Sequence, residues 1–405
     1  MKSIIYLPGL GYSYFNISGH DYAERYMSSL DKMNPDRTKK YYLEKKEFQY
    51  GFENRFSTPV TCIFEYCNSK DESVEVCKIY ECFYVDSLTE KFKKRNMLYK
   101  LVLILLILFT KIWTLVRAIA QKQFLNGKKR LQIFYFFTFL CLIAVFAVLM
   151  FPAMLTSFMG ALNQLFDDDS ILLDQILDNM ASWVTFSYWV TTAMAFLATV
   201  VPEFRNFISN IATEFLCIDS YLTMGNSKLD IIGKLESLVE RVSEEDDYDG
   251  LEVHGYGFGC IVLIDSIFPF GNRPKYRLNS EITNIVTIGC PHDFISTYYP
   301  DYFKNRCIPE KMALKQWSNI YSEVDILSSN FRMDNDDHGG HFKLSDKSVS
   351  IKNILFDVIN VEKLGFWNHL GLIGLKAHQM FWGKGTDSSN CLSLLMENEL
   401  QQETT

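Results

Sequence analysis

The chain has 405 residues and a formal net charge of −8, and aromatic residues make up 15% of it. This composition excludes an intrinsically disordered protein, and the length leaves room for two or three domain-sized units. The acidic balance disfavours a nucleic-acid partner, which would require a basic face. The 10 cysteines are scattered without a Cys-x-x-Cys pair, which favours reduced core cysteines over a disulfide set. No metal and no cofactor is expected.

The first part of the chain, residues 1–90, contains strand and helix signals in alternation. Residues 3–8 are a short apolar run that ends at proline and glycine, as buried strands do, and residues 20–33 have a helical pattern. Residues 58–67 and 75–85 are rich in β-branched and aromatic side chains, which predicts two further strands.

The sequence becomes strongly apolar from about residue 97, within a predicted membrane insertion that covers residues 91–204. Residues 131–155 and 181–201 carry no charged side chain over lengths that suffice to cross a bilayer, so each predicts a transmembrane helix. The loop between them is acidic and the segment before residue 131 is basic. The positive-inside rule then predicts an integral membrane protein whose folded domain lies on the cytoplasmic side.

Residues 98–120 are apolar but carry Lys111 near their centre, where a charge would cost about 3 kcal/mol in a bilayer. If residues 3–8 and 251–254 belong to one sheet, the number of spans between them must be even. We therefore expect residues 98–120 to form an interfacial or partly buried helix that does not cross the membrane.

Helical spacing and β-rich runs alternate again in the second part of the domain, residues 205–385, which precedes a loose polar tail over residues 386–405. The expected elements are a helix at 226–242, a strand at 251–255, a helix at 259–268, and strands at 282–291 and 317–325. This alternation predicts an α/β fold with a mostly parallel sheet and helices on both faces, interrupted by the transmembrane hairpin.

The segment VHGYGFGC, residues 253–260, carries the clearest chemical signal. Serine hydrolases present their nucleophile in a G-x-S-x-G turn between a strand and a helix, where the outer glycines allow a sharp bend. Here Gly255 and Gly259 occupy the outer positions, but Gly257 occupies the central one. A dinucleotide-binding turn is disfavoured, because Cys260 stands where G-x-G-x-x-G would require glycine.

The order of motifs resembles the α/β-hydrolase superfamily, in its lipase-like and esterase-like branch, over about residues 1–90 and 205–385. The segments that carry the resemblance are IIYLPGLG (4–11), CIDSYLT (217–223), the Gly257 turn, IVTIGCPHD (285–293), WSNIYSEVDILSSNF (317–331) and GFWNHLGLIGLKAHQMFW (365–382). The resemblance implies a degenerate nucleophile position at Gly257, a triad acid at Asp325 and a triad histidine at His369. It also implies oxyanion donors in the backbone N–H groups of Phe258 and of Leu10 or Gly11.

Each of these assignments has a plainer alternative. Asp325 would also serve to cap the turn after its strand, and His369 would also fit the start of a helix without a catalytic role. His338 and His341 are rival candidates for the histidine, and they are disfavoured as metal ligands. His254 on the strand before the turn fits a packed core histidine.

Glycine supplies neither an oxygen nor a sulfur nucleophile, so ordinary acyl transfer is not expected. The expected function is a membrane-anchored, lipase-like pseudohydrolase that binds a lipid, an acyl group or a protein. One alternative is an active lipid or ester hydrolase whose serine is replaced at position 257, and another is a membrane effector or signalling protein. Membrane lipids are the expected partners, together with an acyl-lipid ligand or a protein, and the oligomeric state is open.

Overall fold

A computed structural model gives the fold of most of the chain outside the central apolar region. The described residues are 1–10, 17–34, 39–67, 72–96, 202–225, 227–245, 250–270, 278–309, 312–325, 327–332, 339–344, 347–356, 380–383 and 389–403, with isolated positions between 99 and 114 and between 185 and 192.

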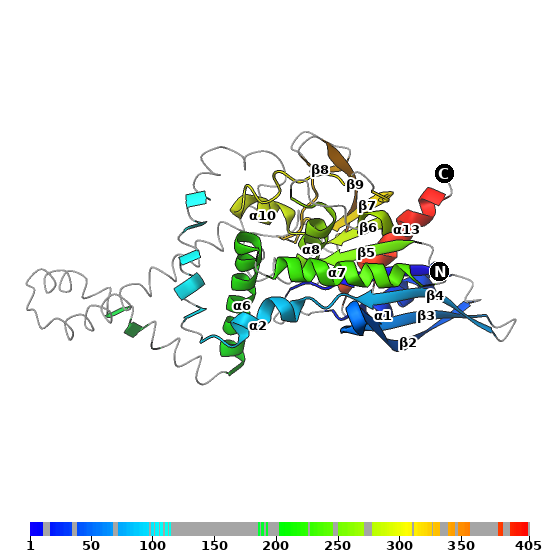
Figure 1. Ribbon diagram of the computed structural model, residues 1–405, viewed down its shortest axis with the longest axis horizontal. Helices are drawn as coiled ribbons and strands as arrows, with labels where there is room; N and C mark the ends of the chain where they lie inside the picture. Colours follow the sequence, from blue (N-terminus) through cyan, green and yellow to red (C-terminus); the bar gives the residue numbers. More distant parts are fainter. Residues whose placement is uncertain are drawn as a thin grey trace, which may run out of the picture.

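Within the described residues, a nine-stranded mixed sheet forms the centre (Figure 1), in the order β2-β3-β4-β1-β5-β6-β7-β9-β8. The strands from β4 through β1, β5, β6 and β7 to β9 pair in parallel, and antiparallel pairs lie at both edges. The bounds are β1 Lys2–Leu7, β2 Lys39–Tyr50, β3 Phe56–Cys67, β4 Glu72–Glu81, β5 Leu251–Tyr256, β6 Ile282–Ile288, β7 Gln316–Tyr321, β8 Gly340–Lys343 and β9 Ser348–Leu355.

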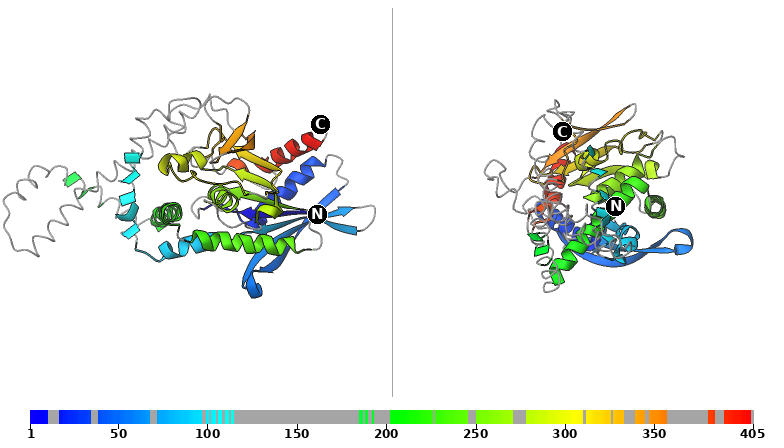
Figure 2. Two further views of the ribbon diagram at one scale, coloured as in Figure 1. Left: turned by 45° about the horizontal axis from the view of Figure 1, so that its top comes forward. Right: turned by 90° about the vertical axis from the view of Figure 1, so that its left-hand side faces the viewer.

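Helices cover both faces of the sheet, and Figure 2 shows α1 and α13 (blue and red) side by side on one face and α7 (green) on the other. The helices are α1 Gly19–Met33, α2 Val85–Lys93, α6 Pro202–Met224, α7 Lys228–Ser243, α8 Phe258–Ile267, α9 Leu278–Glu281, α10 His292–Tyr298 and α13 Cys391–Glu403, with short 3₁₀ turns η1 Phe52–Asn54 and η4 Met380–Trp382. The predicted α/β fold with a mostly parallel sheet and helices on both faces is thereby confirmed.

Strand β1 shows why the sheet is buried on both faces. Successive side chains of a strand point to opposite faces, so Ile4 and Tyr6 pack with α1 and α13, whereas Ile5 and Leu7 pack with α7 and α8. A strand that is buried on both faces has an uninterrupted apolar sequence, which is the run from which this strand was predicted. The strand lies between β4 and β5, so segments on either side of residues 97–201 form one sheet.

Several elements differ from the sequence predictions. The strands β2, β8 and β9 were not predicted, and a helix, α13, stands within the predicted loose tail over 386–405. Cys391, Leu392 and Leu395 of this helix are buried against the sheet and α1, so the tail prediction does not describe the segment.

The predicted transmembrane helices at 131–155 and 181–201 lie outside the described residues, apart from a few positions between 185 and 192. Within the part of the chain that the structure describes, no helix combines the length and the apolar character that a bilayer crossing needs. Helix α6 has 23 residues, but four of them are charged. This finding contradicts the prediction of an integral membrane protein with its domain on the cytoplasmic side.

The described positions between 99 and 114, part of the predicted segment 98–120, are helical. Two lysines among these positions contact the folded domain: Lys100 Nζ donates to Thr213 Oγ1 at 2.9 Å, and Lys111 Nζ donates to the Tyr298 carbonyl at 3.3 Å. Lys100 therefore lies against α6 and Lys111 against the end of α10.

Candidate functional site

The turn between β5 and α8 reverses the chain within one residue, Gly257. Its backbone angles are φ 51° and ψ −119°, a region that residues with a side chain rarely adopt. The Gly257 N–H donates to the Ile288 carbonyl at 2.9 Å, which ties the turn to the end of β6.

The two flanking glycines are required by close packing. A Cβ atom on Gly255 would lie 2.9 Å from both the N and Cα atoms of Cys260. A Cβ atom on Gly259 would overlap the Leu7 carbonyl oxygen and lie 2.7 Å from the Pro8 carbonyl oxygen. The chain after β1 therefore passes directly over the start of α8, and the spacing of the three glycines has a physical cause.

Neither neighbouring nucleophile replaces the side chain that Gly257 lacks. Cys260 and Ser266 are both buried in α8. The Cys260 thiol donates to the Gly255 carbonyl at 3.1 Å, and the Ser266 hydroxyl donates to the Val262 carbonyl at 2.8 Å. Both groups are thus engaged with the backbone next to them.

The predicted oxyanion donors, Phe258 and Leu10, lie on the two segments that meet at this turn. Phe258 is the first residue of α8, so its N–H has no acceptor within the helix. Leu10 follows the chain that crosses over Gly259, and the Tyr84 hydroxyl holds this chain by donating to the Pro8 carbonyl at 2.7 Å. The alternative donor, Gly11, lies outside the described residues.

Asp325 lies in the loop after β7 and is fully buried. Burial and then the negative charge of Asp325 raise the pKa of the Tyr256 phenol, which places the carboxylate near the residue that precedes Gly257. Asp325 Oδ1 also accepts the Leu327 N–H at 3.0 Å, so it does cap the turn after its strand. Its assignment as a triad acid stays a prediction.

The candidate histidines are separated from this turn or undescribed. His369 and His338 lie outside the described residues. His341 is on β8 at the edge of the sheet, with β9, β7 and β6 between it and β5, a separation of about 19 Å at the usual strand spacing. The structure therefore does not bring His341 to Gly257.

His254 belongs to a buried polar network that sequence reasoning did not find. Its Nδ1 pairs with the Tyr22 hydroxyl, and its Nε2 lies 3.1 Å from Glu252 Oε2, which also lies 3.0 Å from Lys2 Nζ. Burial alone would raise the pKa of Glu252, but the hydrogen bond from His254 and the charge of Lys2 outweigh it and lower the pKa to about 2. Tyr22 and His254 are 232 positions apart, so no local pattern predicts their contact.

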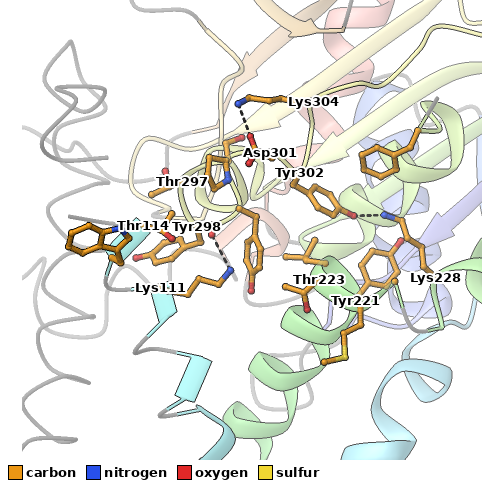
Figure 3. Close-up of a pocket in the computed structure, with 18 residues that line it drawn as sticks. Lys111, Thr114, Tyr221, Thr223, Lys228, Thr297, Tyr298, Asp301, Tyr302 and Lys304 are labelled. Atoms are coloured by element: carbon orange, nitrogen blue, oxygen red, sulfur yellow. Dashed lines mark hydrogen bonds and ion pairs between the residues drawn. The ribbon is translucent and has the colours of Figure 1, made fainter. Parts of the chain in front are cut away.

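A cavity of about 900 Å³ lies beside the turn, between the end of α6, the helical positions near 111–114 and the chain after α10 (Figure 3). Its wall residue Tyr221 contacts the Phe258 ring edge-on, with centroids 5.3 Å apart. Lysines and tyrosines from distant parts of the sequence line it, and this site was not predicted. Among the described residues, no three His, Cys, Asp or Glu side chains converge on a site for a metal ion.

No family model matches this chain, and no curated protein matches it. These results contradict the expected membership of the α/β-hydrolase superfamily. The motifs behind that expectation are short, and the glycines among them are accounted for by backbone packing between β1, β5 and α8. Such a turn shows how a strand and a helix meet, whereas function depends on the groups placed there.

Proposed function

We propose that this protein binds an acyl or lipid ligand at the turn between β5 and α8 and has no serine-hydrolase activity. The observation that carries the proposal is the backbone of Gly257, which has a positive φ at a strand–helix junction, a conformation that would strain a residue with a side chain, but has no side chain. Serine hydrolases hold their nucleophile at such a junction. Without an oxygen or sulfur atom at position 257, a bound acyl group would not be attacked.

Two features support binding of a carbonyl or carboxylate group at this place. The N-terminus of α8 directs backbone N–H groups toward the turn, and such groups attract oxygen atoms that carry negative charge. The chain through Pro8 and Leu10 lies across the start of the same helix and is anchored by Tyr84. A ligand oxygen would thus meet preorganised donors without displacing secondary structure.

The first experiment compares labelling by a fluorophosphonate probe in the wild type and in Gly257→Ser. We expect no labelling of the wild type and clear labelling of the variant, although the strained backbone would cost the variant about 1–3 kcal/mol. Gly233→Ser is the matched control, because position 233 is on α7 with open space around it. It introduces a serine without a neighbouring oxyanion site.

The possible outcomes test separately whether the wild type lacks a nucleophile and whether the turn presents position 257 to a ligand. Labelling of the wild type would refute the absence of a nucleophile. A folded Gly257→Ser variant that labels no better than Gly233→Ser would show that the turn does not present position 257 to a ligand. Adding Asp325→Asn to Gly257→Ser tests the acid. A triad role predicts slower labelling, whereas a turn-capping role predicts unchanged labelling, since the asparagine oxygen can still accept the Leu327 N–H.

The ligand class is tested by competition on the Gly257→Ser variant. p-Nitrophenyl esters of butyrate, octanoate and palmitate are added before the fluorophosphonate probe. Protection that increases with chain length would support an acyl or lipid ligand, since each buried methylene adds about 0.8 kcal/mol. Protection that is independent of chain length would contradict it.

A further inference from the structure

The cavity beside α6 has a charged end built around Lys228. Lys228 Nζ lies 2.8 Å from Asp265 Oδ2 and donates to the Tyr302 hydroxyl at 2.7 Å. Asp265 is fully buried and also pairs with the buried Arg306. One carboxylate thus contacts two cations in this cluster.

Aromatic rings surround the same ammonium group. The ring centroids of Tyr302, Phe270 and Tyr221 lie 4.7, 4.9 and 5.1 Å from Lys228 Nζ. These ring faces already hold a cation, so a cationic ligand would meet repulsion from Lys228 instead of attraction to the rings. The cluster favours a ligand of negative charge.

A second lysine, Lys111, reaches the cavity from the opposite side (Figure 3). Its Nζ lies 3.5 Å from the Tyr299 ring centroid. Burial lowers the pKa of Lys111, because the ammonium group has lost part of its hydration. An anion bound nearby would restore part of that lost stabilisation.

Several hydroxyl groups of the remaining wall are engaged in hydrogen bonds within helices. Ser296 and Thr297 line the cavity, but their hydroxyl groups donate to the carbonyls of His292 and Asp293, both at 2.8 Å. Lys304 at the rim pairs with Asp301 at 2.7 Å, and both side chains are exposed. The interior therefore offers a ligand aromatic faces and two partly buried ammonium groups, beside hydroxyl groups such as that of Tyr221.

The geometry points to a binding site for an amphipathic anion in this cavity. A carboxylate or phosphate head would contact Lys111 or Lys228, and an aromatic or hydrocarbon body would lie against the rings of Tyr221, Phe270 and Tyr299. A volume of about 900 Å³ suits a small molecule of this kind. The site involves neither Gly257 nor the chain through Leu10, so it goes beyond the function proposed for the turn.

Two fluorescent probes of equal body and different charge test this inference. 1-Anilinonaphthalene-8-sulfonate carries one negative charge, and N-phenyl-1-naphthylamine is the same ring system without it. The full chain is titrated with each probe as the wild type, Lys111→Met, Lys228→Met and Lys94→Met. Lys94 is the control because its exposed side chain pairs with Glu90 on α2, outside the cavity.

We expect each cavity variant to bind the sulfonate about tenfold more weakly, as loss of one charged contact predicts. The neutral probe should bind each cavity variant as tightly as the wild type. Lys94→Met should bind both probes as tightly as the wild type. Lys228→Met also removes a partner of Asp265, so circular dichroism checks its fold, and Lys111→Met tests the site without touching that cluster. Sulfonate binding unchanged in a folded Lys111→Met and a folded Lys228→Met would overturn the inference.

Competition with eight-carbon ligands identifies the head group. Octanoate, octyl phosphate and octanol are used to displace the sulfonate probe. We expect the two anions to displace it and octanol to fail, and the stronger anion distinguishes a carboxylate from a phosphate ligand. Displacement by octanol at the same concentration would show that charge is not recognised and would refute the site. None of these readouts depends on labelling at position 257, so the two proposals fail independently.

Discussion

Gly259→Ala is the substitution that most directly tests the packing of the β5–α8 turn. The added Cβ would overlap the Leu7 carbonyl oxygen and approach the Pro8 carbonyl oxygen to 2.7 Å. Both are backbone atoms, and Leu7 pairs with Gly255 in the ladder between β1 and β5, so neither moves without disturbing the sheet. Overpacking of this kind costs about 1–3 kcal/mol or more, and the helix propensity of alanine returns about 1 kcal/mol.

Because the clash is with backbone atoms, the overpacking cost should lie at its upper end, and we expect Gly259→Ala to lower the free energy of unfolding by about 2 kcal/mol. The matched control is Gly233→Ala in α7, where no atom lies within 4 Å of the added Cβ. That variant should gain about 1 kcal/mol, because it makes the same chemical change in a helix without a clash. Urea unfolding followed by circular dichroism and tryptophan fluorescence measures both.

The test is whether Gly259→Ala lowers the free energy of unfolding while Gly233→Ala raises it. A Gly259→Ala variant as stable as Gly233→Ala would show that the chain after β1 does not lie against the start of α8. The close approach of Leu7, Pro8 and α8 would then be wrong, and with it the placement of Leu10 at the candidate site.

Three further predictions concern side chains away from the turn. The pKa of Glu252 is about 2 in the folded chain against an ordinary value of 4.5, so its contribution to the free energy of unfolding is present above pH 4.5 and is lost as the pH falls toward 2. The free energy of unfolding of Glu252→Gln should therefore fall less between pH 4.5 and pH 2 than that of the wild type. The same pH dependence in both proteins would contradict the network around Glu252. Asp265→Asn should lower the free energy of unfolding in urea by about 3–5 kcal/mol, because it leaves Arg306 buried without its carboxylate. Asp301→Asn, which removes a charge from an exposed pair, should lower it by less than about 1 kcal/mol. Equal losses of stability in the two variants would contradict the buried cluster. Cys307 is partly exposed while the other described free cysteines are buried, so site mapping after brief iodoacetamide treatment should find it modified ahead of them; faster modification of a buried cysteine would refute the described packing.

The central strands were predictable because their burial leaves a mark on the sequence. Strand β1 is covered on both faces and is apolar from Ile4 to Leu7, whereas β5 and β6 mix apolar side chains with buried polar ones such as His254 and Thr287. β2 was not predicted, since it is an edge strand with the sequence KKYYLEKKEFQY and mostly exposed side chains. Charged residues protect such an edge from pairing with other chains, and they also hide the strand from a search for apolar runs.

The candidate site divides in a similar way. The Gly257 turn was predictable, because its three glycines and its flanking strand and helix are contiguous in sequence. The network around His254 and the cavity around Lys228 were not, because they join residues far apart in the chain. Asp265 and Arg306, for example, are 41 positions apart and carry no shared motif. Contacts between residues so far apart in sequence can be recognised only once the order of the strands and helices in space is known.

The central position of β1 has a consequence for synthesis on the ribosome. Ser3 of β1 pairs with Leu251 of β5, so about 250 residues must be added before the strand meets its second neighbour. At translation rates of about 5–20 residues per second, this takes roughly 12 to 50 s. During that time β1, β4, β3 and β2 are available to pair, but the unpaired backbone edge of β1 stays open to other nascent chains. Expression at low temperature or with added chaperone should therefore raise the soluble yield more than stabilising substitutions in the folded state.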